Sequence, residues 1–173
     1  MRRQHEAGEI DLRFLDEVGF TLQPVVPYAW QAPGSTIELP ANGGERLSVI
    51  GLLSYDNRFE SYLFDGYVNS DLVIASIDAF VATIEMPTVI VLDNGSMHTA
   101  KAVQQKMPEW EDKGLRLKFL PKYAPELNII EILWKHIKYY WLPFDAYDSY
   151  KKLKRSVSHL LKQVGSKYQI SFA

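Results

Sequence analysis

The sequence contains no cysteine, which excludes disulfide bonds, thiolate zinc sites and a cysteine nucleophile. Long apolar runs are also missing: none approaches the ~20 residues of a membrane-spanning helix, and no signal-peptide core follows the first residues. Neither sign of charge dominates, since 19 Lys and Arg stand against 21 Asp and Glu, for a net charge of −2. This balance gives no sign of strong nonspecific binding to nucleic acid. We therefore expect a cytoplasmic protein without membrane contact.

The chain does have enough apolar material for one core. Hydrophobic residues make up 47% of its 173 residues and aromatic residues 13%, which suits one domain rather than two. Charged residues, at 23%, are too few for a typical disordered chain. We expect one domain over residues 10–173, preceded by an N-terminal tail or linker remnant over residues 1–9, which shows no clear period.

Hydrophobic spacing predicts the secondary structure. Apolar residues alternate over residues 10–20, as in a strand, and residues 23–45 hold four of the nine prolines, as in a long loop. Four more strands are predicted at 47–53, 59–64, 88–92 and 115–120, with a hairpin turn at 55–58. Helices are predicted from 70 up to Pro87, at 96–105, at 128–141 and after Pro143. This order predicts an α/β fold, a mixed five-stranded sheet flanked by helices.

Three acidic residues occupy unusual places. Asp16 interrupts the apolar face of the first strand, where a carboxylate is costly unless it is paired or binds a metal. Asp93 follows a buried strand at an edge of the sheet where ligands bind, and Glu131 lies beside the apolar stripe of a helix. Each also has an ordinary explanation: an edge strand for Asp16, a helix cap for Asp93, and for Glu131 a capping box with Asn128 and an ion pair with Lys135.

The three acids together are more specific than any one of them. If the two strands are neighbours, Asp16, Asp93 and Glu131 meet at one edge of the sheet. Carboxylates in such a cluster repel one another, so the arrangement is typical of hard cations that prefer oxygen ligands. Two Mg²⁺ ions, about 3.5–4 Å apart, would activate a water or a 3′-hydroxyl and stabilise the leaving oxygen of a phosphodiester.

Three segments resemble the catalytic domain of DDE-type insertion-sequence transposases in the mariner-like superfamily. They are FLDEVGF at residues 14–20, VLDNGSMH at 91–98, similar to the D-N-x-x-x-H of the family, and LPKYAPELNIIEILW at 120–134. The last is the most specific, being similar to L-P-P-Y-S-P-x-L-N-P-I-E-x-x-W. The chain departs from this pattern at Lys122, Ala124 and Ile129, and Ile129 replaces a proline preorganised for the first helical turn.

The resemblance implies an RNase H-like fold with Asp16, Asp93 and Glu131 as the catalytic residues and as ligands of two Mg²⁺ or Mn²⁺ ions. It also implies supporting roles for residues beside them: Glu17, Asn94, His98 and Asn128. The implied activity is phosphodiester hydrolysis at the ends of a mobile element, followed by strand transfer to target DNA. A homodimer is one possible assembly, and the sequence leaves the oligomeric state open. The alternatives are another RNase H-like nuclease or resolvase, or a non-catalytic domesticated or degraded remnant.

The expected partner is DNA, at the element ends and at the target. Residues 135–167 carry eight basic residues against two acidic ones, with aromatic residues between them. This stretch could contact phosphates, or it could be the solvated outer face of two amphipathic helices. The predicted DNA-binding residues are Lys122, Lys135, Lys138, Lys151, Lys152, Lys154 and Arg155. We expect end recognition to belong to a helix-turn-helix region that is separate or missing from this chain, since residues 1–9 are too short for one.

Overall fold

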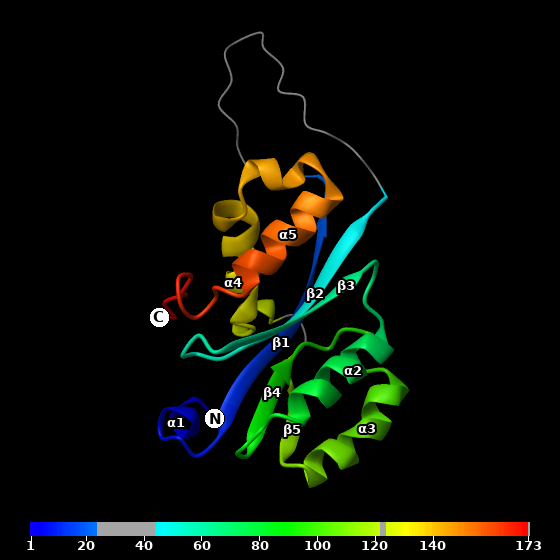
Figure 1. Ribbon diagram of the computed structural model, residues 1–173. Helices are drawn as coiled ribbons and strands as arrows, with labels where there is room; N and C mark the ends of the chain where they lie inside the picture. Colours follow the sequence, from blue (N-terminus) through cyan, green and yellow to red (C-terminus); the bar gives the residue numbers. More distant parts are fainter. Residues whose placement is uncertain (24–43, 122–123, 173) are drawn as a thin grey trace.

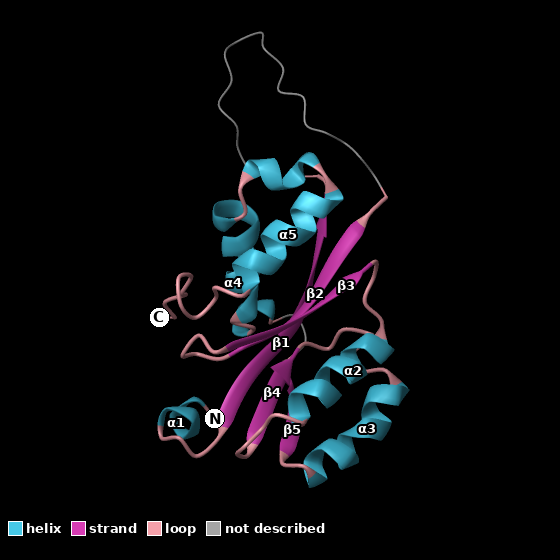
Figure 2. Ribbon diagram, in the orientation of Figure 1, coloured by secondary structure: helices cyan, strands magenta, loops and turns pink. Residues whose placement is uncertain are grey.

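The computed structural model describes residues 1–23, 44–121 and 124–172. Five strands form one sheet in the order β3-β2-β1-β4-β5 (Figure 2). β1 pairs with β2 in antiparallel and with β4 in parallel, so the predicted mixed sheet is confirmed. The strands are β1 (Asp11–Thr21), β2 (Arg46–Leu53), β3 (Phe59–Asp65), β4 (Thr88–Leu92) and β5 (Leu115–Phe119).

Helices cover both faces of the sheet (Figure 1). α2 (Ser70–Val81) and α3 (Lys101–Asp112) share one hydrophobic core with β4 and β5. α4 (Ile130–His136) and α5 (Tyr150–Leu161) share a second core with the opposite face of β1 and β2. The short helix α1 (Arg2–Glu6) lies beside the start of β1. Within the described ranges, no helix has the length and apolar character needed to cross a membrane.

β1 is the strand on which both cores are built. Phe14, Val18 and Phe20 pack into the core under α4 and α5, while Leu15, with its side chain on the other face, is fully buried under α2. This confirms the predicted alternation. Asp16 lies on the same face of β1 as Phe14, Val18 and Phe20, toward α4, and these neighbours are all apolar.

Polar side chains next to the helices and in the hairpin turn determine where several elements begin and end. The Asn69 side chain accepts a hydrogen bond of 3.0 Å from the Leu72 N–H and so caps α2. Asn57, with a φ of 62°, completes the turn between β2 and β3 and confirms the predicted hairpin. Ser149 caps α5 in the same way as Asn69 caps α2.

Three predicted helices differ from the observed ones. The helix predicted from 70 up to Pro87 already ends at Val81. The helix predicted at 96–105 begins only at Lys101, because the preceding residues form a turn in which the N–H of His98 donates to the carbonyl of Gly95. The helix predicted at 128–141 is divided into α4 and a π-helical turn, Ile137–Trp141.

The ends of two predicted segments also need comment. Residues 1–9 include α1, and the N–H of Leu12 donates to His5 Nδ1 over 3.3 Å, which attaches this segment to β1. The predicted loop at 23–45 falls almost entirely outside the described residues.

Candidate functional site

The register of the sheet brings Asp16 and Asp93 to the same edge. β1 and β4 run parallel, with Phe14 opposite Val91 as the last pair of their ladder. Asp16 and Asp93 each follow two residues later, so both lie just beyond the end of that ladder. Glu131 is in the first turn of α4, which packs against β1 and β2. Strand pairing and helix packing thus place the three predicted acids around one position.

The pKa of Asp16 reflects this arrangement. Burial, then the charge of Glu17, and to a smaller extent the charges of Asp93 and Glu131 together raise this pKa from 3.8 to about 7. The backbone hydrogen bond at Glu17 opposes this rise. Burial and the charge of Asp93 likewise raise the pKa of Glu131. Because charges perturb a pKa only at short range, the three carboxyl groups share one electrostatic environment.

The residue types fit a hard divalent cation. Asp16 and Glu131 line a pocket of about 250 Å³, and no Lys or Arg in the described ranges forms an ion pair with Asp16, Asp93 or Glu131. Divalent cations would relieve this uncompensated negative charge, and carboxylate oxygens are the ligands that Mg²⁺ prefers. Asp93 does not line this pocket, and among the described residues no three His, Asp or Glu side chains are grouped closely enough to hold one ion.

His98 connects Asp93 to Glu17. Its side chain is 1% exposed, its Nδ1 lies 2.6 Å from Asp93 Oδ1, and its Nε2 lies 3.2 Å from Glu17 Oε2. The contact with Glu17 is an ion pair without the angles of a hydrogen bond. Burial alone would lower the pKa of His98, but its contacts with Glu17 and then Asp93 outweigh burial and raise it. Glu17 and His98 therefore lie beside the acids, as the resemblance implied.

The turn after β4 is built around Asp93. The N–H of Gly95 donates to Asp93 Oδ1 over 2.8 Å. A Cβ on Gly95 would lie 3.0 Å from that oxygen and 3.4 Å from His98 Nδ1, so glycine leaves the room that the contact needs. Asn94 has a different role from its neighbours, because its side chain donates to the Leu120 carbonyl over 2.5 Å and joins the ends of β4 and β5.

The predicted capping box of α4 is wrong. The first turn of α4 has no side-chain cap, and Asn128 instead donates through Nδ2 to the carbonyl of Leu15 over 3.2 Å. The ladder between β1 and β4 ends at Phe14, so the next carbonyl of β1 needs another donor, and Asn128 supplies it from a fully buried position. Nor is an ion pair between Glu131 and Lys135 present in the described part of the chain. Glu131 faces the pocket instead.

Sequence patterns missed the role of Trp134 and Gly51. Trp134 was expected only in the apolar stripe of its helix, but its indole N–H also donates to Asp16 Oδ2 over 3.2 Å. Gly51 stands directly opposite Asp16 on β2, and a Cβ there would lie 2.6 Å from the Trp134 ring. The signal that could have revealed this contact is a glycine within an apolar strand, which often marks a close approach.

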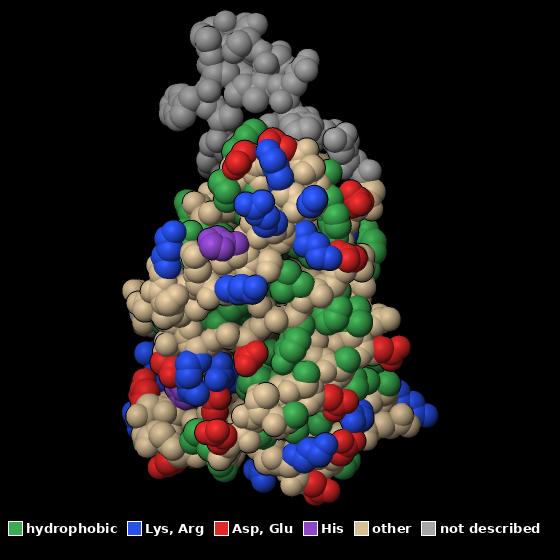
Figure 3. All heavy atoms as spheres, in the orientation of Figure 1, with side chains coloured by type: hydrophobic (Ala, Val, Ile, Leu, Met, Phe, Trp, Pro, Cys, Tyr) green, Lys and Arg blue, Asp and Glu red, His purple; other side chains and the backbone are tan. Residues whose placement is uncertain are grey.

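The predicted DNA-binding residues fall into two groups. Lys135 and Lys138 line pockets together with Glu131. The other four lie on α5, where basic side chains gather on the surface shown in Figure 3, and none of them lines the pockets beside the acids. Two of these are paired internally, Lys152 with Asp148 at 2.6 Å and Lys154 with Asp65 at 2.7 Å. Lys122 lies outside the described residues.

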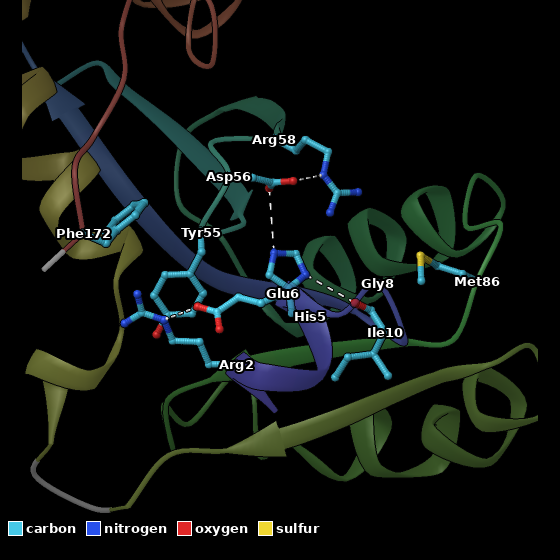
Figure 4. A pocket seen from close by; sticks show the side chains of 10 residues that line it. All are labelled: Arg2, His5, Glu6, Gly8, Ile10, Tyr55, Asp56, Arg58, Met86 and Phe172. Atoms are coloured by element: carbon cyan, nitrogen blue, oxygen red, sulfur yellow. Dashed lines mark hydrogen bonds and ion pairs between the residues drawn. The ribbon is translucent and has the colours of Figure 1, made fainter.

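Another pocket, of about 550 Å³, lies between α1 and the turn that joins β2 to β3 (Figure 4). Its charged residues mostly pair with one another: Arg2 lies 3.0 Å from Glu6, and Arg58 lies 2.7 Å from Asp56. None of the predicted site residues lines it. We therefore take the acid-lined pocket, and not this one, as the candidate active site.

Comparisons with known proteins identify the family and the fold. The family model of the DDE superfamily endonucleases matches residues 11–154. Mos1 transposase in its strand transfer complex superposes with a TM-score of 0.64 at 15% identity, over 96% of this chain and 52% of that one. The Mos1 mariner paired end complex with Mn gives 0.64 at 17%, over 93% and 51%. The catalytic core domain of BIV integrase gives 0.58 at 12%, over 92% and 86%.

These structural likenesses confirm the predicted RNase H-like fold of transposases and integrases. The chain spans about half the length of the Mos1 chains that it matches in these complexes. No curated protein matches the sequence.

Proposed function

The chain belongs to the DDE superfamily endonucleases, and on this basis we propose that it is the catalytic part of a DNA transposase. In this proposal it hydrolyses phosphodiester bonds at the ends of a mobile element and joins the new 3′ end to target DNA. The observation that carries the proposal is the mutual effect of three acids: the charges of Asp93 and Glu131 act on Asp16, whose pKa burial and neighbouring acids raise to about 7, and the charge of Asp93 acts on Glu131. Such a cluster is costly in a protein that has no cation to bind.

The three acids would hold two Mg²⁺ or Mn²⁺ ions, with Asp16 and Asp93 binding them and Glu131 completing the second site. When bound, two such ions activate a water or a 3′-hydroxyl and stabilise the leaving oxygen of a phosphodiester. The donor set, oxygen only, suits these ions. Solved Mos1 paired end complexes with Mn and with Mg support this choice of metal.

The residues around Asp93 and Asp16 fix the orientation of these two carboxylates. Asp93 Oδ1 is bound by the Gly95 N–H and by His98, which leaves Oδ2 as the oxygen available to an ion. The Trp134 N–H donates a hydrogen bond to Asp16 Oδ2, and the Asn128 side chain donates one to the adjacent backbone carbonyl of β1, that of Leu15. Preorganised ligands of this kind reduce the reorganisation that metal binding requires.

We also propose DNA as the partner and a dimer as the working assembly. Support comes from the solved Mos1 transposase complexes, which are described as paired-end and strand transfer complexes. This chain covers about half of each Mos1 chain, and we propose that a region separate from the catalytic domain recognises the element ends. The site of action would be the DNA of the cytoplasm, with the protein associated with the nucleoid when bound.

A cleavage assay on duplexes that carry candidate element ends tests the proposal. With Mg²⁺ or Mn²⁺ the protein should nick such a duplex, and Glu131→Gln should abolish nicking while DNA binding persists. Joining of the product 3′ end to a second duplex separates a transposase from a plain nuclease or resolvase. Failure of the unaltered protein to cut with either ion would favour the non-catalytic remnant, and equal cutting by Glu131→Gln would refute the assigned site.

A further inference from the structure

A groove of about 570 Å³ runs along α4 beside the candidate active site. It shares Glu131, Trp134 and Lys138 with the pocket that contains Asp16, so the two hollows meet at Glu131. Its volume lies within the range of sites that take small organic groups. A ligand that occupies the acid pocket and continues along α4 would therefore enter this groove.

Exposed apolar side chains are concentrated in the stretch of chain that includes α4, and two of them line the groove. Seven large hydrophobic side chains are exposed in the described residues, and five of them lie between residues 127 and 144. Ile132 (38% exposed) and Tyr139 (39%) line the groove itself. A single exposed apolar residue needs no explanation, but a concentration of them marks an interaction site. The five are Leu127, Ile132, Tyr139, Tyr140 and Phe144.

Two cations line the same groove. In the described ranges neither Lys135 nor Lys138 forms an ion pair, unlike Lys152 and Lys154 of α5. Lys138 is partly buried, with its Nζ 5.7 Å from the centroid of the Phe20 ring; burial and the nearby Arg46 lower its pKa, and the charge of Asp16 opposes this. A cation in this setting is stabilised by an anionic ligand. Two acids, Glu126 and Glu131, line the groove as well; as a proposed metal ligand, Glu131 would have its charge offset by the ions.

Exposed aromatic surface beside unpaired cations is the combination that binds single-stranded nucleic acid, in which bases stack on rings and phosphates contact the basic groups. In a duplex the faces of the bases are covered by their neighbours, so only a nucleotide outside the stack can cover Tyr139 and Ile132. We propose that the α4 groove binds an unpaired nucleotide of DNA, with its base on Tyr139 and Ile132 and its phosphate at Lys135 and Lys138. The position of this nucleotide, next to the phosphodiester that is cut, rests on the proposed function.

The test compares two labelled duplexes of the same paired sequence, one blunt and one with a short single-stranded overhang, in EDTA so that cleavage does not occur. The unaltered protein should bind the overhang duplex more tightly. Tyr139→Ala should weaken that binding about 5-fold or more and leave blunt binding unchanged, since stacking on one ring is lost. Tyr139→Trp should retain the preference. Tyr67→Ala, at an aromatic residue that is 79% exposed but does not line the groove, is the matched control and should behave as the unaltered protein.

A separate variant tests the proposed contact between Lys135 and a phosphate. Lys135→Gln should weaken binding of both duplexes, because one phosphate contact is lost. The slope of log affinity against log salt concentration should become shallower by about one. Lys101→Gln, at an exposed lysine of α3, should change neither. Thermal unfolding of each variant establishes that the comparison is between folded proteins.

Three results would overturn the proposal: no preference for the overhang, an equal loss on both duplexes with Tyr139→Ala, or no loss at all. If Tyr139→Ala instead converts an oligomer of the free protein to a monomer in light scattering, the groove is an interface between copies and the nucleotide proposal is wrong. Cleavage is a separate readout. An overhang preference that depends on Tyr139, in a protein that never cuts DNA, would support the groove and contradict the proposed function.

Discussion

His98 Nδ1 lies 2.6 Å from Asp93 Oδ1, while the other nitrogen of the same ring lies 3.2 Å from Glu17 Oε2. Asp16 and Glu17 are consecutive on β1 and point to opposite faces of the strand. Asp16 faces the acid pocket directly, and Glu17 reaches Asp93 through His98. These two consecutive residues of β1 thus supply one of the three acids, Asp16, and contact a second, Asp93, through His98.

Loss of His98 should weaken metal binding. His98→Ala removes the partner of Asp93 Oδ1, so the carboxylate can rotate and we expect about 10- to 100-fold weaker Mn²⁺ binding by titration calorimetry. His98→Asn places an amide N–H near the position of Nδ1 and should recover part of the affinity. Glu17→Gln should cause a smaller loss, because the ring then keeps its contact with Asp93.

His159→Ala, at an exposed histidine of α5, is the control for these measurements and should bind Mn²⁺ normally. Asp93→Asn should bind weakly. Normal affinity in His98→Ala together with weak affinity in Asp93→Asn would show that the histidine does not position the acid.

The metal-free protein should become less stable as the pH rises from about 4 to about 7. The pKa of Asp16 is raised from 3.8 to about 7 by burial and by neighbouring acids, so in this window the folded state holds a proton that the unfolded state has lost. Asp16→Asn removes the buried charge and should stabilise the protein at pH 8 in EDTA. Urea unfolding of both proteins at pH 5 and pH 8 measures the effect, which should be larger at the higher pH. A variant that is less stable at pH 8 would contradict this account.

Gly51→Ala should destabilise the protein by about 1–3 kcal/mol through overpacking. The new Cβ would lie 2.6 Å from the Trp134 ring and 2.9 Å from the Phe59 ring, so the indole must move away from Asp16. Tryptophan fluorescence and urea unfolding report the change. Trp134→Phe shortens the ring at the point of contact, so the double variant should recover part of the loss that Gly51→Ala causes. Additive losses would argue that the two residues do not touch.

The cations of α5 should contribute unequally to DNA binding. Lys151 and Arg155 form no ion pair in the described ranges, whereas Lys152 and Lys154 are engaged with Asp148 and Asp65. Reversing the charge of Lys151 and Arg155 should therefore weaken DNA binding and flatten its salt dependence. The same change at Lys152 and Lys154 should have less effect on binding. Fluorescence anisotropy at several salt concentrations measures both, and unchanged affinity in the first variant would remove α5 from the DNA surface.

The sequence predicted the secondary structure well where a few neighbouring residues determine it. The alternation in β1, the apolar run of β4 and the cap at Asn69 each report a feature of a few neighbouring residues. The start of α3 was missed because the turn at Gly95 follows the side chain of Asp93, a contact that apolar spacing does not record. Asn128 was assigned to the wrong partner for a related reason. Capping spacing describes its own helix, and its actual acceptor, the Leu15 carbonyl, is 113 residues away.

The sequence by itself determined the candidates for the chemistry: three acids in unusual places, a histidine five residues after the second, and a motif of fifteen residues around the third. These features are residue identities and spacings, which the sequence contains without any knowledge of the fold. Only the tertiary structure decided how the acids are held and charged. The register of β1 against β4, the glycine at position 51 that admits Trp134, and the position of Glu17 behind His98 all join residues distant in sequence. The energy of a buried carboxylate depends on such neighbours, and the pattern of a chain does not contain them.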